Sequence, residues 1–150
     1  MKVAILGLGY VGSELLSTIT KNNINVVGYD IDKSKVNALN QKYSVSYKKE
    51  ILNKSSLFIV CVPTPINERH KPDLSFIKKV CKTISDYIQN KPIIVFESTF
   101  YPGVTEDICI KEIEKYSKKK INKDFYVGYS PERYSPGEKR SLSNIDKLVS

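Results

Sequence analysis

The first thirty residues constrain the fold of this chain more than any other stretch. A short apolar run, Val3–Leu6, leads into the hexapeptide GLGYVG at positions 7–12, and an amphipathic stretch follows. A second apolar run, at positions 26–29, then ends in Asp30. Two strands joined through a glycine-rich turn and a helix predict a βαβ unit, whose strands are parallel members of one sheet.

The spacing of the three glycines, G-x-G-x-x-G, is typical of a dinucleotide-binding site. Gly7 permits a tight turn out of the strand, Gly9 lets the backbone approach a pyrophosphate, and Gly12 lets the helix pack closely on the sheet. The phosphates then lie at a helix N-terminus, which attracts anions. The alternative is a structural turn without a ligand. The strand, helix and acid that flank the turn favour the dinucleotide.

Asp30 predicts which dinucleotide is bound. A carboxylate at the end of the second strand accepts hydrogen bonds from a free ribose diol and repels a 2′-phosphate, so we expect NAD rather than NADP. The alternative role for Asp30 is the N-cap of a helix that starts near Lys33. Asp32 is better placed for that cap, which leaves Asp30 for the ribose.

Strands and helices alternate along the rest of the chain. This alternation predicts one α/β domain over residues 1–150, a Rossmann-like, doubly wound, mostly parallel sheet with helices on both faces. Asp73 is a candidate N-cap for the fourth helix, in which Ile77, Val80, Ile84 and Ile88 mark one apolar face. The expected strands lie near 2–6, 25–30, 44–47, 57–62, 92–97 and 125–129, and the helices near 11–22, 33–42, 48–54, 74–89 and 104–118.

Composition argues against several other classes of protein. The net charge of +8 comes from 21 lysines and only 3 arginines, whereas nucleic-acid-binding surfaces favour arginine interleaved with aromatic residues. We therefore expect no nucleic-acid partner. No apolar run is long enough to cross a membrane, and the first strand leaves no room for a leader, so we expect a cytoplasmic protein without a membrane partner.

The three cysteines do not form a recognisable motif. Cys61 lies in an apolar strand pattern, and Cys81 and Cys109 lie in helical patterns. The odd number and wide spacing argue against a disulfide framework and against a zinc site. We expect buried, inert thiols and no bound metal.

Polar residues collect after the strands, at positions 62–65, 97–103 and 129–138. The carboxyl ends of parallel strands share one edge of the sheet, which is where ligands of such folds bind. Four segments there follow the order found in one enzyme family: GLGYVG at 7–12, VPTP at 62–65, EST at 97–99 with PGVTE at 102–106, and SPER at 130–133.

With these segments the chain resembles the UDP-glucose/GDP-mannose dehydrogenase family, the UDP-sugar 6-dehydrogenases, over nearly its whole length. The form Ser-Pro-Glu-Arg-x-x-Pro-Gly at 130–137 is most similar to the branch that acts on UDP-N-acetylhexosamines. The UDP-glucose branch has a phenylalanine in place of Arg133 and a glutamate in place of Pro136. UDP-glucose is accordingly the nearest alternative substrate.

The resemblance implies an oxidoreductase of nucleotide-sugar metabolism and polysaccharide biosynthesis, which uses NAD to oxidise the C6 alcohol of a UDP-sugar to a carboxylate through a cysteine adduct. By the same resemblance Glu132 is the catalytic acid/base, and Arg133 and Tyr134 bind substrate. The residues implied to bind NAD are Gly7, Gly9, Tyr10, Val11, Gly12, Asp30, Lys35, Pro63, Thr64, Ser98 and Thr99.

The family's nucleophilic cysteine belongs to a glycine-rich motif that none of the three cysteines matches, and its catalytic lysine motif is also missing. We therefore expect the NAD-binding part of a longer, homo-oligomeric enzyme whose central helical and C-terminal sugar-nucleotide domains lie elsewhere. The isolated chain is then expected to be inactive. Two alternatives remain: a hydroxyacid dehydrogenase of the 6-phosphogluconate type, and a stand-alone NAD-binding regulatory module.

Overall fold

A parallel sheet forms the centre of the computed structural model, which describes residues 1–66, 68 and 70–131. Within these residues, six strands lie in the order β3-β2-β1-β4-β5-β6, and each neighbouring pair is parallel. This arrangement confirms the predicted Rossmann-like fold. The strands are β1 (Val3–Leu6), β2 (Val26–Tyr29), β3 (Val45–Ser46), β4 (Leu57–Val60), β5 (Ile93–Phe96) and β6 (Tyr126–Tyr129).

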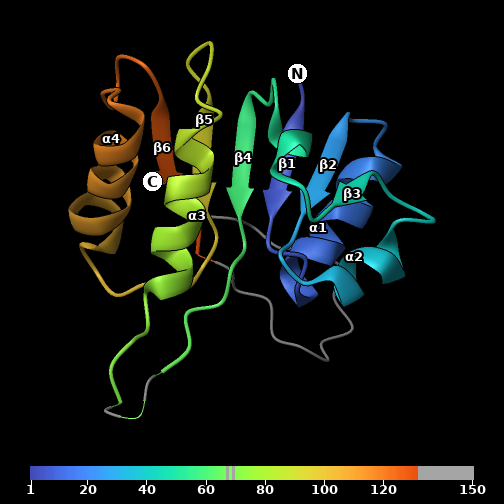
Figure 1. Cartoon of the computed structure of the whole chain (residues 1–150), viewed down its shortest axis with the longest axis horizontal. Helices are drawn as coiled ribbons and strands as arrows, with labels where there is room; N and C mark the ends of the chain where they lie inside the picture. The colour runs from blue at the N-terminus through green and yellow to red at the C-terminus, as the bar shows by residue number, and fades with distance from the viewer. Residues whose placement is uncertain (67, 69, 132–150) are drawn as a thin grey trace.

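Helices connect the strands and cover both faces of the sheet. In Figure 1, α1 and α2 lie beside β1–β3, and α3 and α4 lie beside β4–β6. Two short segments with other hydrogen-bonding patterns complete the connections. The bounds are α1 (Tyr10–Lys21), α2 (Lys33–Leu39), α3 (Ser75–Ser85), α4 (Lys111–Ser117), the 3₁₀ turn η1 (Lys49–Leu52) and the π-helical segment η2 (Thr105–Ile110).

The side chains of β1 alternate between two hydrophobic cores. Ala4 and Leu6 belong to the core formed with α3 and α4, whereas Val3 and Ile5 belong to the core formed with α1 and α2. All four residues are at most 2% exposed. A strand covered on both faces has to be apolar at every position, which accounts for the continuous apolar runs of the sequence.

Several element ends differ from the predictions. The helix expected near 48–54 is only the 3₁₀ turn η1, and the helix expected near 104–118 is divided between η2 and α4. α3 ends at Ser85 rather than near residue 89. The backbone N–H groups of Asp86 and Tyr87 bond to carbonyl groups three residues earlier, which closes the last turn of α3 before the chain enters β5.

The start of α3 also differs from the prediction by one residue. Leu74 occupies the N-cap position, but the carboxylate of Asp73 accepts a hydrogen bond from the N–H of Ser75 at 2.9 Å and so still binds a free backbone donor at the start of the helix. No helix formed by the described residues is long and apolar enough to cross a bilayer.

Candidate dinucleotide-binding site

Two of the three glycines in the loop between β1 and α1, Gly7 and Gly12, have no space for a side chain. Gly7 lies at φ +96°, and a Cβ atom there would come within 2.8 Å of the Cys61 carbonyl oxygen. A Cβ atom on Gly12 would lie 1.9 Å from the Gly7 carbonyl oxygen. Both glycines are therefore needed for α1 to pack against the loop and against the end of β4.

The middle glycine of the loop lies beside open space. A Cβ atom on Gly9 would have no neighbour within 4 Å. Gly9 is the N-cap of α1, with no side-chain hydrogen bond at the cap and no acidic residue in the first turn. The positive end of the helix dipole thus faces open space, an environment that favours an anion.

Asp30 is held in place by the backbone next to the loop. It follows β2 and is 7% exposed. Its Oδ2 atom accepts a hydrogen bond from the N–H of Leu8 at 2.7 Å, and Oδ1 accepts one from the N–H of Asp32 at 2.9 Å. Lys35 Nζ lies 3.9 Å from Oδ2. Each carboxylate oxygen can accept more than one hydrogen bond, so this anchored group still offers acceptors to a diol.

Asp32 is the N-cap of α2, as predicted. Its Oδ1 atom accepts hydrogen bonds from the N–H groups of Ser34 at 2.9 Å and Lys35 at 3.4 Å. The cap of α2 therefore does not need Asp30.

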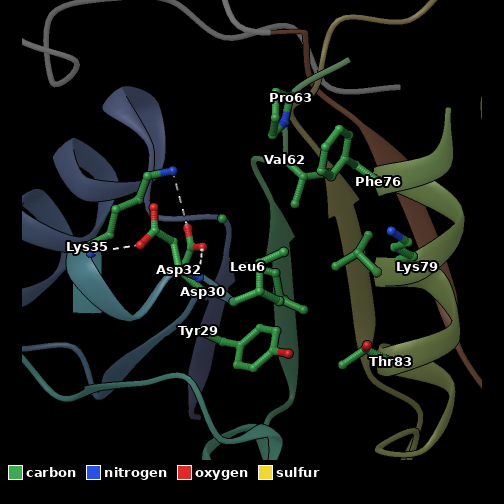
Figure 2. Close-up of a pocket in the computed structure, with 13 residues that line it drawn as sticks. Leu6, Tyr29, Asp30, Asp32, Lys35, Val62, Pro63, Phe76, Lys79 and Thr83 are labelled. Atoms are coloured by element: carbon green, nitrogen blue, oxygen red, sulfur yellow. Dashed lines mark hydrogen bonds and ion pairs between the residues drawn. The ribbon is translucent and has the colours of Figure 1, made fainter. Parts of the chain in front are cut away.

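A cavity of about 360 Å³ opens beside Asp30, and we refer to it as the first cavity (Figure 2). Its volume and its mainly apolar walls are typical of small-molecule sites. One wall comes from the segment after β2, the second from the segment after β4, and the third from α3. The lining residues are Leu6, Gly7, Tyr29, Asp30, Ile31, Asp32, Lys35, Val62, Pro63, Phe76, Lys79, Val80 and Thr83.

Sequence reasoning missed the α3 wall and Ile31. Val80 was predicted to face the core, and no role was predicted for Phe76, Lys79 or Thr83, because only the tertiary fold brings α3 to the cavity beside Asp30. Ile31 did carry a signal that could have been used. It is an apolar residue directly after Asp30, and in the structure it is 69% exposed, as expected for an apolar surface that a ligand covers.

A second cavity, of about 260 Å³, lies between the segments that follow β4 and β5. Thr64 Oγ1 donates a hydrogen bond to the Thr99 carbonyl oxygen at 2.9 Å, and Ser98 Oγ donates one to the Val62 carbonyl oxygen at 2.6 Å. These bonds fix the two segments to each other. The second cavity is lined by Val11, Cys61, Val62, Pro63, Thr64, Glu97, Ser98 and Thr99.

The structure brings most of the predicted NAD-binding residues to these two cavities. Val62 and Pro63 line both, so the two cavities are neighbours. Gly9, Tyr10 and Gly12 line neither cavity and belong to the loop and α1. The predicted Glu132, Arg133 and Tyr134 lie outside the described residues.

Three residues of the second cavity, Cys61, Val62 and Glu97, were not among the predicted site residues. Glu97 is 7% exposed and directly follows β5, a position at which a carboxylate signals a site. Cys61 was expected to be buried within a strand, but it is half-buried, lies one residue beyond β4 and lines the cavity.

The other two cysteines are buried, as predicted. A hydrogen bond with Cys109 and burial raise the pKa of the Cys81 thiol well above its usual value, so this thiol stays protonated and unreactive. Within residues 1–66, 68 and 70–131, no three His, Cys, Asp or Glu side chains are grouped so that they could hold a metal ion.

The sequence matches known proteins over its whole length. A family model described as "UDP-glucose/GDP-mannose dehydrogenase family, NAD binding domain" matches residues 1–51 and 41–149. The UDP-N-acetyl-D-glucosamine 6-dehydrogenase of Pseudomonas aeruginosa is 38% identical over 168 residues, covering 100% of this chain and 40% of that protein. Protein CapL of Staphylococcus aureus is 39% identical, covering 99% of this chain and 39% of its own length.

Solved structures share the fold. The UDP-D-ManNAc dehydrogenase of Pyrococcus horikoshii superposes with a TM-score of 0.84 at 30% identity, covering 91% of this chain and 37% of that chain. A ternary complex of the GDP-mannose dehydrogenase of Pseudomonas aeruginosa gives a TM-score of 0.82 at 29% identity, covering 88% of this chain and 36% of that chain. The present chain thus spans about two fifths of the length of the curated relatives it matches.

Proposed function

Since this chain belongs to the NAD-binding domain of the UDP-glucose/GDP-mannose dehydrogenase family, we propose that it supplies the NAD-binding part of a UDP-N-acetylhexosamine 6-dehydrogenase. NAD is its cofactor, as predicted. The proposed reaction oxidises the C6 alcohol of UDP-N-acetylglucosamine or UDP-N-acetylgalactosamine to the uronic acid. The two relatives of Pseudomonas aeruginosa and Salmonella typhi named UDP-N-acetyl-D-glucosamine 6-dehydrogenase, each 38% identical over 168 residues, support this substrate class.

The observation that carries the proposal is the position of Asp30, which is fixed at the rim of the first cavity and bonded to the glycine loop. In the proposed complex Asp30 accepts hydrogen bonds from the adenosine ribose, with Lys35 close to its carboxylate. The adenine ring occupies the first cavity, and the pyrophosphate lies beside Gly9, where a Cβ atom would have no neighbour.

In this proposal the nicotinamide half of NAD occupies the second cavity. When bound there, NAD supplies the acceptor for the hydride that leaves the substrate carbon. Thr64 and Ser98, each bonded to a backbone carbonyl across the two segments, keep the cavity walls in one position. Such preorganised walls hold the cofactor in one orientation, which hydride transfer requires.

The remaining roles are proposals that rest on the resemblance of the SPER segment. Glu132 serves as acid/base through water, and Arg133 and Tyr134 bind the UDP-sugar. The covalent cysteine, the catalytic lysine and the central and C-terminal domains belong to the rest of a longer enzyme. Its homo-oligomeric state and cytoplasmic location are part of the same proposal.

Steady-state kinetics on the full-length enzyme test these roles. Arg133→Ala should raise KM for the UDP-sugar with a smaller effect on kcat, because it removes binding. Glu132→Gln should lower kcat by about 10²–10⁴-fold with a modest change in KM. A Glu132→Gln enzyme with full kcat and a lower melting temperature would make this residue structural.

A substrate comparison tests the proposal as a whole. The full-length enzyme, supplied with NAD⁺, is assayed by NADH absorbance with UDP-N-acetylglucosamine, UDP-N-acetylgalactosamine and UDP-glucose. We expect the highest kcat/KM with an N-acetylated sugar. Highest activity with UDP-glucose would support the alternative substrate, and activity with none of the three would contradict a UDP-sugar 6-dehydrogenase.

A further inference from the structure

Two hydroxyl groups at the base of the first cavity have no role in the fold. Tyr29 comes from β2 and Thr83 from α3, and Figure 2 shows the Tyr29 hydroxyl directed toward Thr83 on the opposite wall of the cavity. The residues are 6% and 8% exposed. Within the part of the chain that the structure describes, no hydrogen bond joins either hydroxyl to another group.

A hydroxyl that faces a cavity and has no protein partner is free to bond to a ligand, which replaces the water there. Burial, the nearby Asp30, and to a smaller extent Tyr87 and Glu50 raise the pKa of Tyr29. The phenol therefore stays protonated and able to donate. Thr83 can both donate and accept.

The rest of the cavity explains what kind of ligand these hydroxyls suit. Leu6, Val62, Phe76 and Val80 provide apolar walls above them. Apolar walls over a pair of hydrogen-bonding groups fit a flat heteroaromatic ring that enters edge first. The 6-amino group of adenine donates hydrogen bonds and its N1 atom accepts one, so both groups on this edge can be matched by hydroxyls.

We propose that Tyr29 and Thr83 bind the N1 and 6-amino edge of the adenine base and so make the first cavity selective for an unmodified adenine. The inference rests on the proposed function, because it places the adenosine half of NAD in this cavity. It adds two specificity-determining residues that lie apart from the glycine loop and the ribose-binding carboxylate.

The test compares NAD⁺ with its 1,N6-etheno analogue, in which a two-carbon bridge caps both N1 and the 6-amino nitrogen. Dissociation constants are measured by calorimetry for the wild type and for Tyr29→Phe, Thr83→Val and the double variant. Thr83→Val keeps the size of the side chain and Tyr29→Phe removes only the phenolic oxygen, so Thr83→Val shows the loss of a hydrogen bond without a change in steric exclusion of the bridge. Matched controls outside the cavity are Tyr43→Phe and Thr20→Val, and thermal unfolding verifies that each variant is folded.

We expect Tyr29→Phe and Thr83→Val each to weaken NAD⁺ binding by about 2- to 10-fold, the range of one hydrogen bond, and to leave etheno-NAD⁺ binding unchanged. The preference of the wild type for NAD⁺ should therefore shrink in the single variants and shrink further in the double variant. The two controls should keep the full preference.

An unchanged preference in both single variants, or an equal loss for both dinucleotides, would overturn the inference and leave the proposed function intact. If Thr83→Val does not fold, Tyr29→Phe alone decides. A wild type that binds neither dinucleotide would overturn the proposed function and this inference together.

Discussion

The carboxylate of Asp30 is oriented by the protein before a ligand arrives. Hydrogen bonds from the Leu8 and Asp32 N–H groups hold its two oxygens, and Asp32 rather than Asp30 caps α2. The side chain therefore loses little conformational entropy when a ribose binds. The same negative charge disfavours a 2′-phosphate at this position.

Replacing Asp30 should remove both the oriented acceptors for the ribose and the negative charge that disfavours a 2′-phosphate. Asp30→Ala is expected to weaken NADH binding about 10- to 100-fold, since a hydrogen bond to a charged group contributes about 1.5–3 kcal/mol. The preference for NADH over NADPH should also decrease. Calorimetric titration of both cofactors measures this, with Asp107→Ala as the control because the side chain of Asp107 is 71% exposed and pairs with Lys111. Equal affinity of the wild type for NADPH, or unchanged NADH binding by Asp30→Ala, would contradict the assignment.

Two glycines of the same loop should respond in opposite ways to the addition of a methyl group. A Cβ atom on Gly12 would meet the Gly7 carbonyl oxygen at 1.9 Å, whereas one on Gly9 would meet nothing within 4 Å. Gly12→Ala is therefore expected to destabilise the fold by about 1–3 kcal/mol or more. Gly9→Ala should change stability little and weaken NADH binding at least about tenfold, because its methyl group enters the space proposed for the pyrophosphate.

Urea unfolding and NADH titration of the two alanine variants separate these effects. Each variant serves as the control for the other, since both change the same hexapeptide by one methyl group. A Gly9→Ala protein that binds NADH as the wild type does would show that the pyrophosphate lies elsewhere. A Gly12→Ala protein of unchanged stability would show that the loop can move away from α1.

Single residues of the site were predictable where a motif fixes them, and not where the fold alone positions them. Asp30, the glycine loop, Thr64 and Ser98 follow directly from strand ends, so their common location could be predicted. Thr83 could not, because it lies in the last turn of α3 and reaches the first cavity only through the packing of α3 on the sheet.

Among the elements, the strands were predicted better than the helix ends. All six strands lie within the predicted ranges. β1, β2 and β4 are apolar runs because a strand buried on both faces needs such a run, whereas β3 and β6 are half-buried or more exposed. Ile88 is only 2% exposed although α3 ends at Ser85, so the apolar stripe indicated burial correctly and helix length incorrectly. The division of the last helix into η2 and α4 left no signal in the pattern of apolar residues, since both segments bury the same face against α3.

The C-terminal end of α4 is tied to the next segment by Glu114. Its Oε2 atom lies 3.1 Å from Lys120 Nζ, and Oε1 accepts a hydrogen bond from the Ile121 N–H at 3.2 Å. The Lys120 hydrogen bond, together with that N–H, lowers the pKa of Glu114 from its usual value of 4.5. A group whose pKa is lower in the folded state stabilises the fold above its unfolded pKa, and this contribution is lost as the pH falls through the folded value.

Glu114→Gln should therefore destabilise the protein at neutral pH and not in acid. We expect the melting temperature of the variant to be about 1–3 °C lower than that of the wild type at pH 7. The difference should disappear as the pH is lowered from 4.5 through the depressed pKa. Thermal unfolding followed by circular dichroism over this range measures it, with Glu106→Gln as the exposed control on η2. A difference that persists in acid would assign the effect of Glu114 to its shape rather than its charge.

At the scale of the whole molecule, the sheet brings together segments that are far apart in the sequence. The glycine loop, Asp30 and the segments after β4 and β5 meet at one edge because all of the strands are parallel. Val62 and Pro63 line both cavities and so lie where the two halves of the dinucleotide are proposed to join. This arrangement provides a cofactor site, and the cysteine among its lining residues is Cys61, which we do not expect to act as the nucleophile.

A protein consisting of residues 1–150 alone should therefore bind NADH without oxidising UDP-sugars. An acid/base residue contributes about 10²–10⁴-fold to a rate and does not replace a covalent step. Cys81 and Cys109 are buried, and Cys61, although it lines the second cavity, lies outside the glycine-rich motif of the family. When NAD⁺ is supplied with UDP-N-acetylglucosamine, UDP-N-acetylgalactosamine or UDP-glucose, the absorbance of NADH should not increase, while calorimetry on the same protein detects NADH binding. Steady turnover that Cys61→Ser abolishes would instead identify a thiol at the edge of this sheet as the nucleophile.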